Sequence, residues 1–308
     1  MLRPILTAIL FASPLAAAPL TEVVLTQSDG RIHIEIGGKP FSDFYFGPDA
    51  PKPYLHPLRS ADGRIVTRRF PMEENVPGET TTDKHHRGVW LGYSSVNGFD
   101  FWQNEFSYNN KLAGKVVAVN VKTIKDGFTG TFHWLSPPGQ AMLEETRTMT
   151  FSGDARLRIV DVEIALKALI DTKFGDSKDG AFCVRLAEPL TEKNGGIITN
   201  SAGGRGMKET WGKPAEWVDY SGVLDGEKLG VALFDSPESF HHPARWHVRD
   251  YGLLAINPFG SSAFDPKLPD ASFALAAGKS IHMRYRIVVH PEMKPGELED
   301  IYRQFRRH

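Results

Sequence analysis

Hydrophobic and polar positions alternate along most of the chain, and this period of two is typical of β-strands that bury one face. In the first half, strands are expected at residues 22–26, 31–36, 41–46, 54–58, 65–69, 115–124, 128–135, 141–151 and 157–168. In the second half, they are expected at residues 181–187, 216–222, 229–235, 245–248, 252–257 and 280–290. Strands of this length and number predict an all-β fold, a large antiparallel β-sandwich of two broad packed sheets.

One short helix is predicted at the C-terminal end. Pro295 and Gly296 precede it, its first turn is acidic and its last turn is basic, which complements the helix dipole. Its apolar stripe has the spacing i, i+3, i+4 and i+7 and consists of Leu298, Ile301, Tyr302 and Phe305. The helix is expected to cap the sandwich.

Residues 1–18 differ from the rest of the chain. Arg3 provides a positive charge, residues 5–15 are apolar, and small residues follow. This pattern predicts a secretory signal peptide, too short to span a membrane, followed by a single domain over residues 19–308. No other stretch approaches the roughly 20 apolar residues of a membrane helix. We therefore expect an exported protein, secreted or periplasmic, without membrane insertion.

The composition excludes several functions. The 36 basic residues balance the 37 acidic ones, so nothing favours nucleic acid or an anionic membrane as a partner. Cys183 is the only cysteine, which rules out an internal disulfide and a cysteine-based metal cage. No Gly-x-Ser-x-Gly motif supports serine hydrolase chemistry.

Residues 79–105 form the stretch that is densest in reactive side chains, because charged, amide and histidine residues are interleaved there with aromatic ones. Such a mixture is typical of a concave site in which aromatic walls take the apolar face of a ligand and polar groups orient it. A sugar requires both. The catalytic candidates are His85 and His86, as acid or base, with Asp83 and Glu79 to orient a ring nitrogen.

Further residues of this stretch and of the last third of the chain are expected to bind the substrate. The arginines, the amides and an aspartate would bind hydroxyls or a carboxylate, and the tryptophans would stack on a sugar face. These residues are Arg87, Trp90, Asn97, Asp100, Trp102, His241, His242, Arg245, Trp246, His247 and Asn257. Adjacent strand residues face opposite sides, so His85 and His86 share one pocket only where the backbone bends.

Two alternatives remain open from the residues alone. A metal-dependent enzyme would combine His85 or His86, a histidine of the second half, and Asp83 or Glu79 into a nitrogen and oxygen ligand set for zinc or another divalent ion. No HExxH spacing marks such a site, so no cofactor is predicted and a divalent metal is kept as the alternative. A non-catalytic sugar-binding protein would use the same residues without turnover.

Three segments carry a resemblance to a known family. They are HPLRSADG at residues 56–63, DKHHRGVWLGYSSVNGFDFW at residues 83–102, and FDSPESFHHPARWHVRDYGLLAINPFG at residues 234–260. Together they resemble the PmoA-like domain family of bacteria over nearly the whole mature chain. The membrane methane monooxygenase subunit of that name spans the bilayer several times, whereas this chain contains no such span.

A fainter resemblance is to the galactose mutarotase-like supersandwich. The segments 86–88 and 98–100, with Trp102, are similar to a His-Gly-Gly…Gly-Phe-Asp…Trp segment of aldose epimerases, which implies that His86 or His85 contacts a sugar. The catalytic base of those enzymes is a late carboxylate, and its counterpart here is Asn257, which cannot take a proton. The resemblance therefore implies a retained pocket and a changed reaction.

These observations predict a carbohydrate-active β-supersandwich protein, an enzyme that acts on a saccharide or glycoside with a histidine acid or base. Hydrolase, lyase and epimerase chemistry all remain open. Two carboxyls about 5 to 10 Å apart would mark a glycosidase, and the sequence does not show such a pair.

Overall fold

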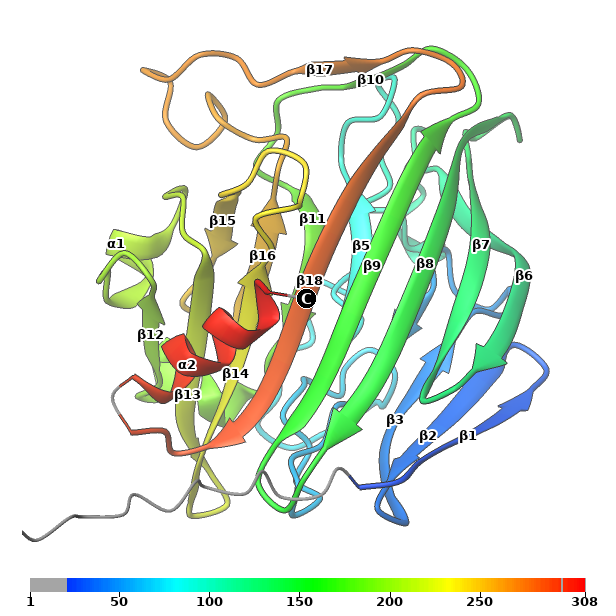
Figure 1. The fold of residues 1–308 in the computed structure, drawn as a ribbon. Coiled ribbons are helices and arrows are strands. Elements are labelled where there is room, and N and C mark those ends of the chain that lie inside the picture. Colours follow the sequence, from blue (N-terminus) through cyan, green and yellow to red (C-terminus); the bar gives the residue numbers. More distant parts are fainter. Residues whose placement is uncertain (1–20, 295, 308) are drawn as a thin grey trace, which may run out of the picture.

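The computed structural model describes residues 21–294 and 296–307 and consists mainly of two large antiparallel sheets (Figure 1). The predicted signal peptide, residues 1–18, lies outside the described residues. Both large sheets have eight strands, and every hydrogen-bonded pair of neighbouring strands is antiparallel. The predicted all-β sandwich is confirmed.

The first sheet has the strand order β1-β2-β3-β4-β5-β11-β16-β15. Its strands are β1 (Val23–Ser28), β2 (Arg31–Ile36), β3 (Lys39–Tyr45), β4 (Tyr54–Leu55), β5 (Val89–Tyr93), β11 (Gly180–Arg185), β16 (Leu253–Asn257) and β15 (Arg245–Val248). Strands β5 of the first third and β16 of the last third therefore lie in one sheet with only β11 between them, which brings the two parts of the predicted site to the same sheet.

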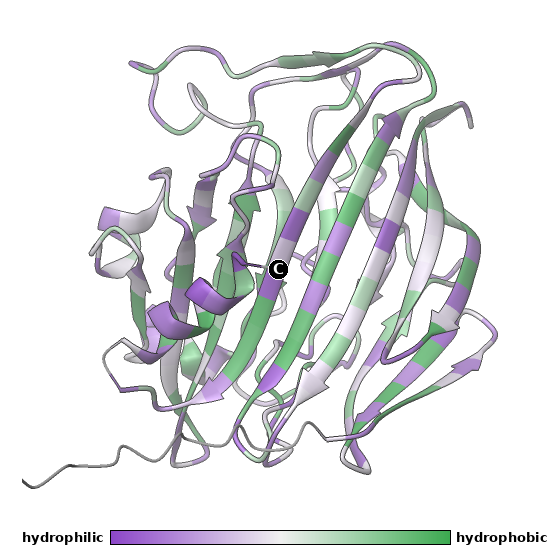
Figure 2. Cartoon of the chain, in the orientation of Figure 1, coloured by the Kyte–Doolittle hydropathy of each residue, from purple (hydrophilic) through white to green (hydrophobic). Residues whose placement is uncertain are grey.

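The second sheet has the order β12-β13-β14-β18-β9-β8-β7-β6. Its strands are β12 (Ile197–Asn200), β13 (Trp217–Leu224), β14 (Glu227–Asp235), β18 (Ser280–Pro291), β9 (Arg158–Ala168), β8 (Ala141–Gly153), β7 (Gly127–Leu135) and β6 (Lys115–Ile124). A small separate ribbon pairs β10 (Thr172–Phe174) with β17 (Phe273–Leu275). Hydrophilic and hydrophobic bands alternate along the long strands in Figure 2, as the period of two predicts.

The main core lies between the two sheets. Phe44 of β3 stacks on Phe128 of β7 with ring centroids 4.3 Å apart, and Phe182 of β11 stacks on Tyr285 of β18 at 5.3 Å. Contacts of this kind bury the inner faces of both sheets against each other, so a ligand site has to be built on an outer face or at a rim.

Different elements cover the two outer faces. Helix α2 (Glu297–Phe305) packs Tyr302 and Phe305 against Phe234 of the second sheet and lies across it in Figure 1, so the predicted capping helix is confirmed. The first sheet instead carries a second aromatic cluster on its outer face, where Trp102 from a loop packs beside Trp90 of β5. Segments 46–53, 56–88 and 94–114, which lie outside the strands, supply this cover.

Several elements differ from the expectations. Strand β12 and a short helix α1 (Gly206–Thr210) lie between residues 187 and 216, where no element was expected, and three 3-10 turns occur at Phe106–Tyr108, Glu188–Leu190 and Glu192–Asn194. The strand expected at residues 65–69 forms only isolated bridges, because Ile65 pairs with Arg59 while Thr67 pairs with Leu186. Two different partners prevent a continuous ladder.

None of the helices formed by residues 21–294 and 296–307 is long and apolar enough to cross a membrane.

Candidate functional site

The backbone around His85 and His86 is a turn and not a strand. Asp83 and Gly88 both have positive φ angles, of 52° and 53°, and the amide of His86 donates to the carbonyl oxygen of Asp83 at 3.0 Å. A Cβ on Gly88 would lie 2.2 Å from the carbonyl oxygen of Leu55, so only glycine fits there. The backbone bend that would let His85 and His86 share one site is therefore present. It brings the centroids of the two imidazole rings to within 4.2 Å of each other.

Aromatic rings from distant parts of the chain surround His86. Its ring stacks on Trp90 at 5.1 Å, meets Trp102 at 5.4 Å and faces Tyr251 at 6.4 Å between centroids. Trp102 in turn stacks on His247 at 6.2 Å. The predicted meeting of the first third with the last third of the chain is therefore observed, on the outer face of the first sheet.

His85 lies at the edge of this cluster and reaches a pocket. The pocket has a volume of about 370 Å³ and is lined by Asp83, His85, Gln103, Tyr108 and Asn110. The Nδ1 atom of His85 shares a hydrogen bond of 3.1 Å with the hydroxyl of Tyr108. His86 lies deeper, so of the two imidazoles His85 is the one that a ligand in this pocket meets.

Both imidazoles are uncharged near neutral pH. Burial, together with the positive charges of Lys52 and Arg68, lowers the pKa of His85 to about 2. Burial also lowers the pKa of His86 well below its usual value, with His85 and Arg185 adding to the effect. A neutral imidazole accepts or donates a hydrogen bond and takes up a proton, but it has no imidazolium proton to deliver.

Three buried basic residues that the sequence analysis missed lie next to the imidazoles. The Nζ atom of Lys52 donates to the carbonyl oxygen of Trp102 at 3.1 Å and to Oδ1 of Asn104 at 2.6 Å, and burial lowers its pKa to about 8. Arg68 and Arg185 are 0% and 1% exposed. A signal was available for Arg185, because it ends the otherwise apolar run Ala-Phe-Cys-Val, where a charged residue has no solvent to reach.

Glu79 and Asp100, two acidic residues that were predicted to belong to the site, bond to its backbone. The carboxylate of Glu79 accepts hydrogen bonds from the amides of Arg69 and Phe70 at 2.8 to 3.0 Å. Oδ1 of Asp100 accepts from the amides of Trp102 and Gln103 at 2.8 and 2.9 Å. Both carboxylates hold turns in place, which explains why acidic residues occur at these points of the sequence.

Asn97 and Arg87 are also held by neighbours within the protein. Asn97 lies at a positive φ of 52° and its side-chain amide donates to the carbonyl oxygen of Asp171. Arg87 forms a two-point ion pair with Glu105 at 2.8 and 2.7 Å and lies over the ring of Tyr54. The Arg87–Glu105 pair joins the turn that carries the imidazoles to the loop after Trp102, whereas Asn97 joins its own turn to the segment before β10.

Of the three late histidines, only His247 has contacts with the His86 cluster among those that the described residues make. The ring of His241 bonds the carbonyl oxygen of Pro258 at 2.9 Å, and His242 bonds Oδ2 of Asp235, a residue of the second sheet, at 3.0 Å. His241 has a positive φ of 58°, so the backbone between His241 and His247 is not extended throughout.

The remaining late candidates make structural hydrogen bonds. Arg245 donates to the carbonyl oxygen of Gly212 at 2.8 Å, and Trp246 donates to that of Ala215 at 2.9 Å. Asn257 is buried and its side-chain amide donates to the carbonyl oxygen of Ser177 at 2.8 Å. Trp246 points into the core because residues alternate along β15, and this leaves its neighbour His247 on the outer face.

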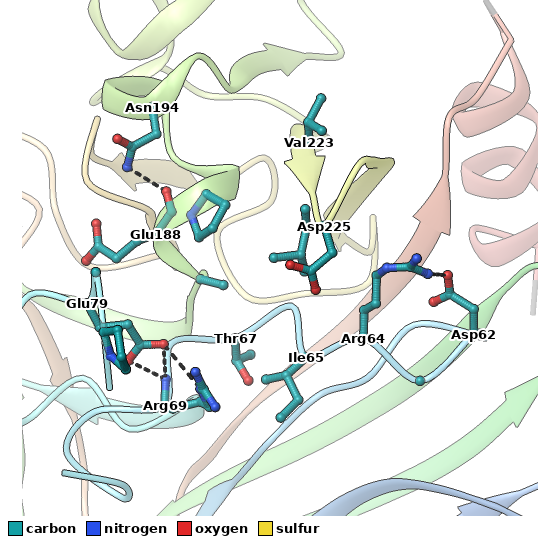
Figure 3. A pocket seen from close by; sticks show the side chains of 16 residues that line it. Asp62, Arg64, Ile65, Thr67, Arg69, Glu79, Glu188, Asn194, Val223 and Asp225 are labelled. Carbon is teal, nitrogen blue, oxygen red and sulfur yellow. Dashed lines mark hydrogen bonds and ion pairs between the residues drawn. The ribbon is translucent and has the colours of Figure 1, made fainter. Parts of the chain in front are cut away.

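A larger pocket of about 970 Å³ shares no lining residue with the pocket at His85 (Figure 3). Thr67, Glu79, Glu188 and Asp225 are among its lining residues, and no aromatic ring lines it. Its two arginines already pair with carboxylates within the protein, as the close-up in Figure 3 shows for Arg64 with Asp62 and for Arg69 with Glu79. Without a ring to face a sugar, this cleft fits a saccharide less well than the smaller pocket does.

The described residues do not include a group of three or more His, Cys, Asp or Glu side chains placed to hold a metal ion. The ligand set suggested for the metal-dependent alternative is therefore not assembled among residues 21–294 and 296–307, where Glu79 bonds backbone amides and His85 bonds Tyr108.

The sequence profile of a family of unknown function, DUF6807, matches residues 31–303. The chain belongs to the DUF6807 family. The match covers the second sheet, the first sheet from β2 onward and every residue of the candidate site. No curated protein matches this DUF6807 member, and the PmoA-like label remains a resemblance.

Several solved structures are similar in part. The GH36 α-galactosidase AgaB from Geobacillus stearothermophilus aligns at 10% identity over 88% of the DUF6807 chain and 41% of its own, with a TM-score of 0.44. A variant of α-galactosidase AgaA from the same organism, in complex with raffinose, aligns at 10% identity over 89% and 41%, with a TM-score of 0.39. A galactose mutarotase-like protein from Clostridium acetobutylicum aligns at 10% identity over 89% and 99%, with a TM-score of 0.42.

The DUF6807 chain thus spans about two fifths of the length of each α-galactosidase. At this level of similarity, the activities of these proteins do not transfer to the chain.

Proposed function

We propose that the protein is an exported carbohydrate-active protein that binds a saccharide or glycoside in the pocket beside His85 and acts on it there. The observation that carries this proposal is the placement of His85 between a pocket and an aromatic cluster. The pocket has carboxylate, amide and hydroxyl groups, and the cluster consists of the buried rings of His86 and Trp102 and the half-buried ring of Tyr251. Polar groups for hydroxyls beside ring faces for C–H bonds are what a sugar requires.

The chemistry that His85 offers depends on its tautomer. If the hydroxyl of Tyr108 donates to Nδ1, then Nε2 carries the proton and donates to the ligand. If Nδ1 donates to Tyr108, then the lone pair of Nε2 is free and His85 acts as a base. Because the pKa of His85 is lowered to about 2, chiefly by burial, the neutral ring serves in either tautomer across the physiological range.

Binding without turnover is the second candidate, and the same pKa values favour it. A base whose pKa is lowered so far by burial is weak unless the ligand brings a negative charge close to the ring. Both forms of the proposal use the same pocket, so they differ in what happens to the saccharide and not in where it binds.

The experiment is calorimetric titration of the purified protein with a panel of mono- and oligosaccharides, followed by NMR of each mixture after prolonged incubation. We expect at least one saccharide to bind, and His85→Ala to weaken its binding by about 10-fold or more, the loss expected for a buried polar contact. The matched control is His133→Ala, which alters a half-exposed histidine of β7 that pairs with Glu144.

Turnover that is lost in His85→Ala supports an enzyme, and binding without any change in the saccharide supports a binding protein. Failure of the whole panel to bind, or equal affinities of His85→Ala and wild type, contradicts the proposal.

A further inference from the structure

Two buried guanidinium groups beside the paired imidazoles are incompletely bonded. Arg68 donates from Nη1 to the carbonyl oxygen of Thr82 at 2.9 Å and from Nη2 to that of Asp83 at 2.7 Å. Arg185 donates from Nη2 to the hydroxyl of Thr80 at 3.3 Å. In the described part of the chain, Nε of Arg68 and both Nε and Nη1 of Arg185 have no hydrogen-bond partner.

The two guanidiniums also lack a full set of counter-charges. Glu188 lies 3.5 Å from Nη2 of Arg185, and within residues 21–294 and 296–307 no second carboxylate forms an ion pair with either arginine. From further away, the carboxylate of Asp83 acts on both arginines, and those of Glu188 and Glu79 act on Arg68. Burial, and then repulsion by Arg185, lowers the pKa of Arg68 to about 10. A buried cation whose donors are partly unused is unfavourable until an anion completes its surroundings.

Additional cations gather around Tyr251, a half-buried residue that reaches the surface. The guanidinium of Arg185 lies 4.6 Å from its ring centroid, that of Arg249 lies 5.4 Å away, and the amine of Lys193 lies 5.7 Å away. The Nε atom of Arg249 is buried and also lacks a partner in the described structure. A ligand that contacts this ring therefore meets three cationic side chains, of which Lys193 also pairs with Asp250 at 4.0 Å and Arg185 with Glu188 at 3.5 Å, besides the neutral ring of His86.

We propose that the saccharide bound at this site carries an oxyanion, which is held by Arg185, Arg68 and Arg249 next to the ring of Tyr251. This inference rests on the proposed saccharide function and names its substrate class. The planar guanidinium suits both a carboxylate and a sulfate, so the shared chemistry is that of a uronic acid residue or a sulfated sugar. The oxyanion would accept from the donors that the protein leaves unused and would offset the repulsion among the cations.

Matched pairs of ligands test the inference. Galacturonate is compared with galactose, glucuronate with glucose, and galactose 6-sulfate with galactose, as monosaccharides and as short oligosaccharides, by calorimetry at low and moderate salt. We expect the acidic member to bind about 10-fold or more tightly than the neutral one, as for charge-assisted hydrogen bonds. The advantage should shrink as salt rises, because part of the site is exposed. A preference among the acidic ligands distinguishes a carboxylate from a sulfate.

Two variants test whether these arginines bind the oxyanion. Arg185→Gln removes the central guanidinium, and Arg249→Gln removes a half-buried one whose loss spares the core. Each is expected to reduce the advantage of the acidic ligand about 5-fold or more and to leave the neutral ligand nearly unaffected. The control is Arg156→Gln, at an exposed arginine that pairs with Glu297.

Equal affinity for the acidic and neutral members of every pair overturns the inference and leaves the saccharide function standing. Variants that weaken both members equally overturn it as well. Failure of all members to bind overturns the saccharide function itself, so the two claims fail in different ways.

Discussion

Lys52 is a buried amine beneath the candidate site, and the free energy of burying its charge can be worked out from the structure. The residue is 1% exposed and donates to the carbonyl oxygen of Trp102 and to Asn104. Burial lowers its pKa from 10.5 to about 8 in the folded protein. At about 1.4 kcal/mol per pH unit, holding the proton in the folded state near neutral pH costs about 3 kcal/mol.

The direction in which the free energy of unfolding changes with pH follows from the number of protons bound in each state. Between about pH 8 and the unfolded value near 10.5, the unfolded chain holds more protons on Lys52 than the folded chain does, so the free energy of unfolding rises with pH. Lys52→Met keeps the aliphatic chain and removes this titration. Urea unfolding of both proteins at several pH values from about 7.5 to 10 isolates the titration of Lys52, because the other titratable groups are the same in both. We expect the wild type to gain about 2 kcal/mol over the variant across that range. A difference between the two proteins that stays constant with pH would refute the reasoning.

Three further predictions concern the loop that holds the site and the second sheet. Glu105→Gln leaves Arg87 in a mostly buried position without its ion pair and should lower the free energy of unfolding by about 2 to 3 kcal/mol in urea titrations. Gly88→Ala should destabilise the protein by more than about 2 kcal/mol and weaken ligand binding, because its Cβ would collide with a backbone carbonyl of β4 at 2.2 Å. Burial lowers the pKa of His290, but its hydrogen-bonded partner Asp219 outweighs this and raises the pKa in the folded protein. The stability that protonated His290 contributes is therefore complete below its pKa in the unfolded chain, near 6.5, and is lost as pH rises through its pKa in the folded protein. His290→Gln should flatten that part of the stability profile, measured by thermal unfolding.

Much of the fold could be predicted because alternation is a direct consequence of strand geometry. The strands Arg31–Ile36, Lys115–Ile124 and Arg245–Val248 begin and end where the pattern of apolar residues begins and ends. Strand β12 and helix α1 were missed because they are short and lie among glycines, where local signals favour a loop.

The site could be predicted only in part. The density of polar and aromatic residues at 79–105 correctly placed His85 and His86 beside Trp102. However, the same density did not distinguish ligand-facing groups from groups such as Glu79, whose carboxylate bonds backbone amides. A sequence gives residue types, and the partner of each side chain depends on turns that bring distant segments together.

Arg185 and Lys52 were overlooked for a related reason. Charged residues are expected at the surface, and their burial becomes visible only when the covering loops are in place. His241 and His242 show the opposite error. They were grouped with His247 by proximity in sequence, but the left-handed backbone at His241 directs them to other partners.

The position of a bound saccharide in a crystal of the protein tests the central claim most directly. We expect ligand density between His85, Tyr108 and the ring of Tyr251, with any oxyanion directed at Arg185. Density confined to the larger cleft between Thr67 and Asp225, with nothing beside His85, would contradict it.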